Sequence, residues 1–472
     1  MKSVNFSTKS NEIDYNAEVS KAEEAVEKAK KYKGLTLNVT WNKGLMAQEL
    51  LLYSAPLWEK LTGIKVNLIQ LMIHETYPAI EAERKNNSSF YDVISITPSR
   101  LPDYTEIKAL EPLDSYIDRH GFRSELDDIA PQYRDNWMTW EDKIYTIPDD
   151  GDIIFLYYRK DLFEDSENKL LFKSQYGYDL APPKTWIEFD QMAEFFTNNF
   201  SPDLYGCAMI HDSLSFYFFE ERFRENGGRF FDEETMNASI NSEIGIKTLT
   251  QMVNRVKYMP PDAGRWGFMD VLQAFISGKI AMTEFWPPLG RWSEGYGTDG
   301  EQLSWVPKSE VAGKVGYAVT PGGYSALAAG FGLSISADSR NKEAAYLFIQ
   351  WLSSKEVSLK RVQIPYSLRD PYRTSHYNSQ EYKNLWANAG DYLELMKTAG
   401  KSSLLDLSLY QVNRYEIILT EALNHAFTEE ISAKVALDNA ARLWNGLTNY
   451  IGVEKQRKAY KEWAQRPNAY PR

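Results

Sequence analysis

Short predicted strands alternate with amphipathic helices near the start of the chain, and this alternation most constrains the fold. Residues 35–41 alternate apolar and polar side chains and are rich in β-branched residues, which predicts a strand. Apolar side chains three or four residues apart over 50–61 predict a helix, and 64–70 and 91–96 predict two more strands. Strands joined to helices by short loops are typical of a parallel sheet covered by helices.

Composition excludes several classes of protein. The net charge of −12 argues against a nucleic-acid-binding surface, which needs a basic face. The single cysteine, Cys207, excludes an internal disulfide and a cysteine-rich zinc site. The sequence has no apolar run of about 18 residues, so it predicts no membrane-spanning helix. The 30 Tyr and 13 Trp favour a ligand-binding cleft, because amphipathic rings line such sites.

Sequence motifs for catalysis are missing. The chain contains no His-Glu-x-x-His, no Gly-x-x-x-x-Gly-Lys-Ser/Thr and no Gly-x-Gly-x-x-Gly. Gly323-Tyr-Ser325 begins like a nucleophile elbow, but Leu327 stands where the second glycine belongs. The five histidines are scattered, and none forms a pair at ligand spacing. We therefore expect no enzyme, no bound metal and no cofactor.

An acidic link at 149–152 joins two predicted strands. Its three aspartates could form a metal cluster, a general acid–base pair, a solvated connection or a contact to a ligand. The neighbouring Tyr145 and Tyr157 favour the ligand contact.

Several short segments occur in an order that is specific when taken together. They are 57–66 (LWEKLTGIKV), 91–96 (YDVISI), 110–114 (LEPLD), 142–148 (DKIYTIP), 156–163 (LYYRKDLF), 183–186 (PKTW), 275–282 (FISGKIAM) with Trp286, 330–336 (GFGLSIS), 341–345 (NKEAA), 351–355 (WLSSK) and 435–437 (VAL). Over about 57–440 the chain resembles the extracellular solute-binding proteins of bacterial ABC importers, in the carbohydrate-binding group.

The resemblance implies an α/β fold of two lobes, each a mostly parallel sheet covered by helices, that close on a ligand about short crossovers. Lobe one is expected at 34–148 and 328–363, and lobe two at 153–322 and 366–472. The crossovers are expected near 149–152, 322–330 and 364–366. Residues 1–33 are expected to be an extension, with an amphipathic helix at 12–32 that either packs on the body or binds a partner.

The resemblance also implies which residues line the cleft, because ligands in such folds sit at the carboxyl ends of the strands. Aromatic rings would cover the apolar face of a sugar, and Asp, Asn and Arg would bond its hydroxyls. The expected ligand-binding residues are Trp41, Asn42, Thr97, Ser99, Arg100, Asp150, Asp152, Trp286, Phe331, Tyr366, Arg369 and Tyr410.

The implied function is a monomeric receptor that captures a sugar, oligosaccharide or polyol and delivers it to an ABC transporter permease. We expect a periplasmic location after removal of a signal peptide, or a lipid-anchored extracellular form. Two alternatives stay open. Arg100 and Arg369 would suit an anionic solute that is not a sugar, and paired carboxylates would suit a secreted enzyme acting on carbohydrate.

Overall fold

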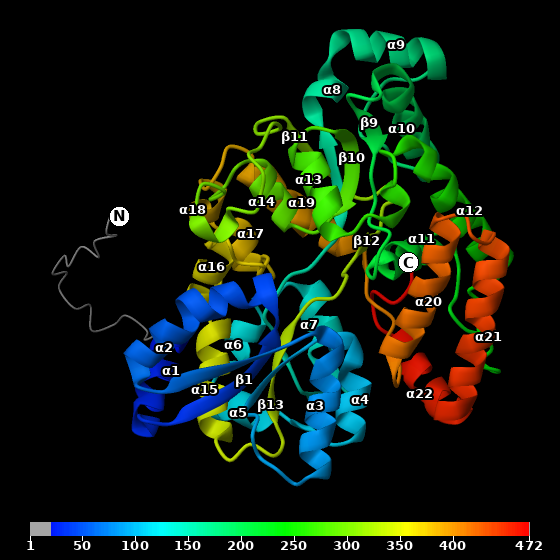
Figure 1. The fold of residues 1–472 in the computed structure, drawn as a ribbon. Helices are drawn as coiled ribbons and strands as arrows, with labels where there is room; N and C mark the ends of the chain where they lie inside the picture. The colour runs from blue at the N-terminus through cyan, green and yellow to red at the C-terminus, as the bar shows by residue number, and fades with distance from the viewer. Residues whose placement is uncertain (1–19, 472) are drawn as a thin grey trace.

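The computed structural model describes residues 20–471, which form two α/β units stacked one above the other (Figure 1). Each unit is built on its own sheet, and we call them lobe one and lobe two. The two-lobe α/β architecture expected from the sequence is confirmed. No helix within residues 20–471 is long and apolar enough to cross a membrane.

Lobe one contains a six-stranded sheet in the order β2-β1-β3-β13-β4, with β7 also paired to β13. Its strands are β1 (Thr36–Asn42), β2 (Lys65–Leu71), β3 (Val93–Ile96), β4 (Leu110–Glu111), β7 (Ile147–Pro148) and β13 (Gly332–Ser336). Strand β1 runs parallel to β2 and β3, as the early strand–helix alternation predicts. Strand β13 is antiparallel to β3, β4 and β7, because the chain returns from lobe two to form it.

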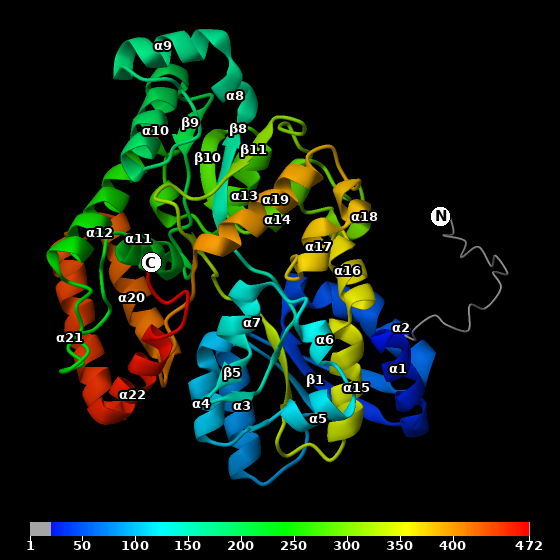
Figure 2. The ribbon, with the colours of Figure 1, turned by 180° about the vertical axis from the view of Figure 1, so that it is seen from behind.

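Helices cover both faces of this sheet, with α1 and α15 on one side and α3 and α4 on the other (Figure 1). The helices of lobe one are α1 (Lys21–Ala29), α2 (Ala55–Thr62), α3 (Ile73–Lys85), α4 (Leu101–Glu106), α5 (Asp114–Arg119), α6 (Arg123–Leu126), α7 (Pro131–Trp137), α15 (Lys342–Ser353) and α16 (Lys355–Gln363). A small hairpin, β5 (Thr139–Trp140) with β6 (Lys143–Ile144), lies beside α7 (Figure 2).

Lobe two contains a four-stranded sheet in the order β11-β8-β10-β9. Its strands are β8 (Phe155–Arg159), β9 (Tyr205–Cys207), β10 (Ile280–Phe285) and β11 (Val315–Ala318), and β12 (Ser325–Ala326) pairs separately with β14 (Ser403–Leu404). Strand β9 is parallel to β10, and β8 is antiparallel to both of its neighbours, β10 and β11, so β9, β10 and β11 share one direction and β8 alone runs against them. Its strands come from segments far apart in the chain, whose directions a local pattern cannot fix.

The sheet of lobe two is covered by α8 (Lys160–Glu164), α9 (Ser166–Tyr176), α10 (Trp186–Phe200), α13 (Phe268–Ile276), α14 (Pro288–Ser293), α17 (Thr374–Asn378), α18 (Gln380–Lys383) and α19 (Ala389–Ala399). A further layer consists of α11 (Ser215–Glu225), α12 (Glu243–Arg255), α20 (Val412–Phe427), α21 (Ala433–Ile451) and α22 (Val453–Ala464). This layer extends down beside lobe one (Figure 1). Helix α10 begins with the capping box Thr185–Glu188, in which the side chain of each residue accepts a hydrogen bond from the backbone amide of the other.

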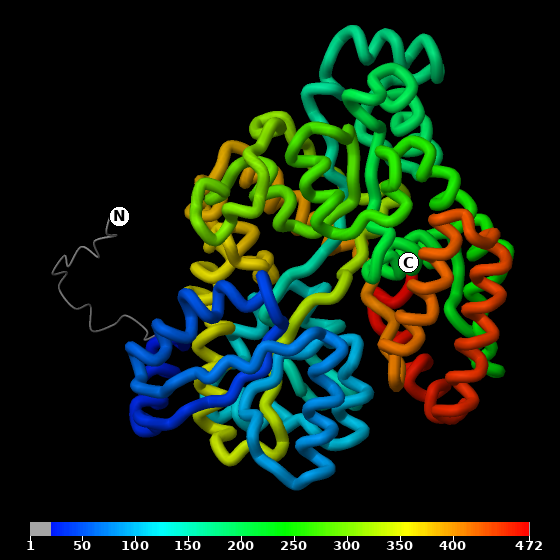
Figure 3. Tube along the Cα trace, viewed as in Figure 1, coloured from blue at the N-terminus to red at the C-terminus, as the bar shows by residue number. Residues whose placement is uncertain are grey.

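The chain passes between the two sheets at 149–154 and 319–331, and again after α16 (Figure 3). Backbone contacts tie the first and last passages together. The amide of Gly151 donates to the carbonyl of Asp370 at 3.1 Å, and a Cβ on Gly151 would lie 2.2 Å from the carbonyl oxygen of Pro371. Glycine is therefore required where these two segments cross.

Helix α1 belongs to the body of lobe one. It begins at the capping box Ser20–Glu23, and the start of the helix predicted at 12–32 lies outside the described residues. Its small side chains Ala25 and Ala29 are fully buried, and the helix packs against α15. Of the two interpretations of this helix, packing on the body is the one that fits residues 21–29.

Replacing Ala25 with Leu should destabilise the protein, because extra methylene groups in a close-packed helix interface cost about 1–3 kcal/mol. Glu27→Leu is the matched control, since Glu27 is exposed on the same helix and should change the free energy of unfolding by less than about 0.5 kcal/mol. Denaturant unfolding measures both. Equal effects of the two substitutions would contradict the packing role of α1.

Candidate functional site

A cavity of about 420 Å³ lies between the two lobes at the crossovers. It is lined by Asn42, Lys43, Leu45, Met46, Met72, Ile73, Asp152, Leu214, Tyr217, Phe268, Met269, Trp286, Pro288, Ala329, Phe331, Leu368 and Asp370. Asn42 ends β1 and Met72 follows β2, which are parallel neighbours whose carboxyl ends meet at this edge. Its volume falls within the range of small-molecule sites, about 300–1,000 Å³.

Trp286 forms part of the lobe-two wall and is 6% exposed. Its indole N–H donates to the carbonyl of Ala328 at 3.1 Å. Tyr217 and Phe218 meet its ring edge to face, with centroids 6.0 and 5.7 Å away. The indole is therefore held rigidly between a packed aromatic cluster and the cavity.

Three buried aspartates lie at the base of the cavity. One carboxylate oxygen from each of Asp150, Asp152 and Asp370 lies within 4.8 Å of the others. Asp152 accepts a hydrogen bond from the amide of Gly330 at 3.1 Å, and Asp150 accepts one from the amide of Asp370 at 2.7 Å. Asp152 and Asp370 line the cavity, whereas Asp150 lies behind them.

Burial controls the protonation of this group. It raises the pKa of Asp370 to about 8, although Arg291 opposes the shift. It raises the pKa of Asp150 to about 6 against the opposing charge of Arg369, and it raises the pKa of Asp152 well above its ordinary value. Removing carboxylates from water disfavours their charged form, so this group retains protons near neutral pH.

A family model described as bacterial extracellular solute-binding protein matches residues 23–358. The chain belongs to this family. A solute-binding protein from Agrobacterium radiobacter in complex with ribitol superposes with a TM-score of 0.70 at 22% identity, covering 88% of this chain and 99% of that one. A second from Agrobacterium vitis, with bound D-mannitol, gives 0.67 at 22% identity, covering 89% and 99%.

Curated relatives share part of their length with this solute-binding protein. A probable amino-acid ABC transporter periplasmic-binding protein of Sinorhizobium fredii is 23% identical over 306 residues, which cover 63% of this chain and 64% of the relative. A mannitol-binding protein of Pseudomonas aeruginosa is 28% identical over 242 residues, 49% of each. The matches thus span about half to two thirds of these relatives.

Four of the expected ligand-binding residues line the cavity of the solute-binding protein: Asn42, Asp152, Trp286 and Phe331. Trp41 lies behind the wall, 1% exposed, and its indole N–H donates to the carbonyl of Met46 at 3.0 Å.

Arg369 and Asp150 also lie behind the cavity wall. The Arg369 guanidinium is buried between Asp149, at 2.8 Å, and Asp150, at 3.1 Å. It also lies 4.7 Å from the centre of the Trp41 ring. Arg369 thus supports the wall and does not line the cavity.

The loop after β3 contacts the C-terminal helices. Ser99 accepts a hydrogen bond on its carbonyl from Ser408 at 2.7 Å, and the neighbouring Thr97 is buried. Arg100 donates to Asn413 at 2.9 Å and pairs with Glu416 on α20 at 3.4 Å. This loop therefore joins lobe one directly to α20, outside the cavity lining.

Two expected tyrosines also lie outside the cavity lining. Tyr366 is half-buried beside the last passage between the lobes. Tyr410 packs under Lys455, whose Nζ lies 4.2 Å from the ring centre, and its backbone bonds Gln456.

Sequence reasoning missed several residues of the cavity, chiefly Asp370, Tyr217, Met46, Met72, Phe268 and Leu368. The sequence did offer a signal for Asp370, because it follows the expected site residue Arg369 and lies close to the expected crossover at 364–366. The apolar residues carry no such signal, because a methionine or leucine on a cavity wall has the same local pattern as one in a core.

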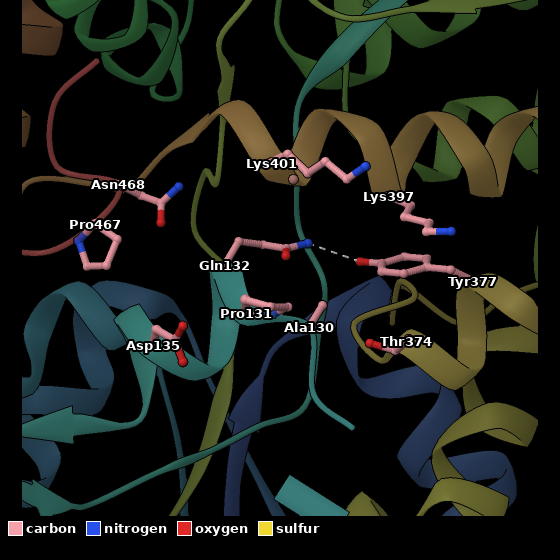
Figure 4. Close-up of a pocket in the computed structure, with 11 residues that line it drawn as sticks. Ala130, Pro131, Gln132, Asp135, Thr374, Tyr377, Lys397, Lys401, Pro467 and Asn468 are labelled. Atoms are coloured by element: carbon pink, nitrogen blue, oxygen red, sulfur yellow. Dashed lines mark hydrogen bonds between the residues drawn. The ribbon is translucent and has the colours of Figure 1, made fainter. Parts of the chain in front are cut away.

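A second cavity, of about 300 Å³, is lined by residues of α7 and α19 and of the segments beside them (Figure 4). Gln132 donates to the hydroxyl of Tyr377 at 3.3 Å, and that hydroxyl donates to the carbonyl of Pro371 at 3.1 Å. Lys397 and Lys401 lie above this pair, on and just after α19 (Figure 4). The Tyr377 hydroxyl thus contacts the last passage between the lobes at the residue after Asp370.

Asp370 should make stability depend on pH. Its pKa of about 8 exceeds the ordinary 3.8, so between about pH 5 and 8 the folded state binds more protons than the unfolded state. The free energy of unfolding therefore falls as pH rises, by up to about 1.4 kcal/mol per pH unit for one proton. Asp370→Asn should flatten this decline, whereas the exposed control Asp299→Asn should not. Denaturant unfolding across this pH range measures the slopes, and equal slopes would contradict the assignment.

Arg100→Met should shift the ligand-free protein towards a more open arrangement. The substitution leaves Glu416 buried without its cation, and breaking a buried pair costs about 3–5 kcal/mol. Small-angle scattering should show a larger radius of gyration than in the wild type. Arg123→Met is the control, because Arg123 pairs with Asp118 on the exposed surface of lobe one. An unchanged radius in both variants would contradict the role of Arg100 in joining the lobes.

Proposed function

We propose that this protein is a receptor that captures a sugar, oligosaccharide or polyol between its lobes and delivers it to the permease of an ABC importer. The observation that carries the proposal is the cavity at the crossovers, whose lining combines Trp286 and Phe331 with Asp152 and Asp370. Aromatic rings suit the apolar face of a sugar, and carboxylates accept hydrogen bonds from its hydroxyls. The ribitol and D-mannitol complexes of two structural neighbours support this choice of ligand.

The proposal includes a mechanism of capture. The lobes close about 149–152, 322–330 and 364–366, and Asn42, Asp152, Trp286, Phe331 and Asp370 contact the ligand. The protein acts as a monomer outside the cytoplasm, either free in the periplasm or lipid-anchored. It leaves the bound solute chemically unchanged, in keeping with a family of transport proteins.

Mass spectrometry of the solute released on denaturation tests the choice of ligand. Calorimetric titration with ribitol, D-mannitol and maltose then measures affinity, and small-angle scattering should show a smaller radius of gyration at saturation. Recovery of a cleaved glycan would favour the enzyme alternative. An unchanged radius with ligand bound would contradict the closing mechanism.

Trp286→Ala should weaken binding of the ligand so identified about thirtyfold, because truncating an aromatic contact at a binding site commonly costs about 2 kcal/mol. It should also lower stability, since the indole is 6% exposed. Trp444→Ala is the matched control: its indole is fully buried and likewise donates to a carbonyl, that of Tyr415 at 3.0 Å, but lies outside the cavity lining. Trp444→Ala should lose stability and keep its affinity. Equal ligand affinities of the two variants would show that Trp286 does not contact the ligand.

A further inference from the structure

Buried carboxylates outnumber buried guanidinium groups around the crossovers. The carboxylates are those of Glu49, Asp149, Asp150, Asp152 and Asp370, and the guanidinium groups are those of Arg291, Arg361 and Arg369. With every group ionised, the cluster would carry two more negative charges than positive ones. Burial raises the pKa of Asp152 and Asp370, so these two side chains hold protons in the ligand-free protein, and a bound cation would take the place of those protons.

The guanidinium groups of Arg361 and Arg369 form ion pairs outside the cavity lining. Arg361 pairs with Glu49 at 2.9 Å and also with Asp149. Arg369 pairs with Asp149 and Asp150. The positive charges nearest the first crossover are therefore already matched by carboxylates that do not line the cavity.

The carboxyl oxygens with unused hydrogen-bonding capacity belong to two residues that line the cavity. Asp152 receives the Gly330 amide and forms no ion pair within residues 20–471. Asp370 lies 3.1 Å from Arg291, yet no donor in the described part of the chain hydrogen-bonds either of its carboxylate oxygens, although the side chain is 1% exposed. Both side chains line the cavity.

The rest of the cavity lining has few groups that could bind an anion. Most of the lining is apolar, including Met46, Met72 and Leu368. Arg100 and Arg369, which would suit an anionic solute, are engaged in other pairs. Lys43 is the remaining cation of the lining, and it is exposed at the rim. A carboxylate-bearing solute would thus meet two buried carboxylates.

We infer that the captured solute carries a protonated amine, which lies between Asp152 and Asp370, on a hydroxylated carbon skeleton packed against Trp286 and Phe331. The solute is then an amino sugar or an amino polyol. An ammonium group brings three donors and one positive charge, and its hydrogen bonds to carboxylates are charge-assisted. The inference rests on the proposed function, because it assigns the ligand class of the same cavity.

The test uses solutes that differ in one group. Sorbitol, 1-amino-1-deoxysorbitol and gluconate form an open-chain series, and glucose, glucosamine and glucuronate form a ring series. We expect calorimetry at pH 7 and constant ionic strength to show the amine of one series bound at least tenfold more tightly than its neutral partner, and the acids bound most weakly.

A lack of preference for the amine in both series would overturn the inference. If sorbitol or glucose bound as well as its amine, the carbohydrate receptor would stand and only the ammonium assignment would fall. If neither the neutral nor the amine solutes bound, both the ammonium assignment and the proposed carbohydrate ligand would be wrong.

Two substitutions test which residue produces the preference for the amine solute. Asp370→Asn should reduce the ratio of amine to neutral affinity about tenfold, because the amide keeps an oxygen that accepts hydrogen bonds but removes the negative charge. Asp406→Asn is the matched control, because Asp406 is also buried and accepts the Ala329 amide at 3.0 Å but does not line the cavity. Its affinity ratio should equal that of the wild type. An unchanged ratio in Asp370→Asn would overturn the inference.

Discussion

The buried ion pairs between the first and last passages of the chain organise the centre of the molecule. Asp149 and Asp150 follow β7, and they are held by Arg361 and Arg369 from α16 and the segment after it. Charges are stable at such depth only when they are paired and hydrogen-bonded, so the two segments must keep this alignment. The alignment places the side chains of Asp152 and Asp370 at the base of the cavity, one from each segment.

The two lobes contribute different structural features to the cavity wall. Lobe one contributes the carboxyl ends of parallel strands, where backbone direction brings Asn42 and the residues after β2 to one edge. Lobe two contributes an aromatic cluster in which Trp286 is fixed by the Ala328 carbonyl and by the rings of Tyr217 and Phe218. In the proposed receptor, a rigid aromatic wall would orient a ligand before the lobes close, which would lower the entropy lost on binding.

The C-terminal helices give the two lobes a second connection. Arg100 reaches Asn413 and Glu416 on α20, and Gln411 donates its amide to Asp103 at 2.7 Å. Burial raises the pKa of Asp103 to about 7 and also raises that of Glu416, so these contacts place carboxyl groups out of water. In the closing mechanism proposed above, opening the lobes would rehydrate these groups, so the balance between open and closed forms would depend on these pairs as well as on the ligand.

Local patterns in the sequence determined the parts of this protein that depend on neighbouring residues. Strands β1, β2 and β3, the capping box of α10 and the strand-end position of Asn42 follow from side-chain periodicity and chain order. The family resemblance pointed to Asp152, Trp286 and Phe331, and all three line the cavity. Only the tertiary structure decided the direction of β13, the engagement of Arg369 by Asp149 and Asp150, and the place of Asp370 in the cavity. These features depend on segments about 200 residues apart meeting in space, and a charged residue has the same local pattern whether its partner is a ligand or another buried side chain.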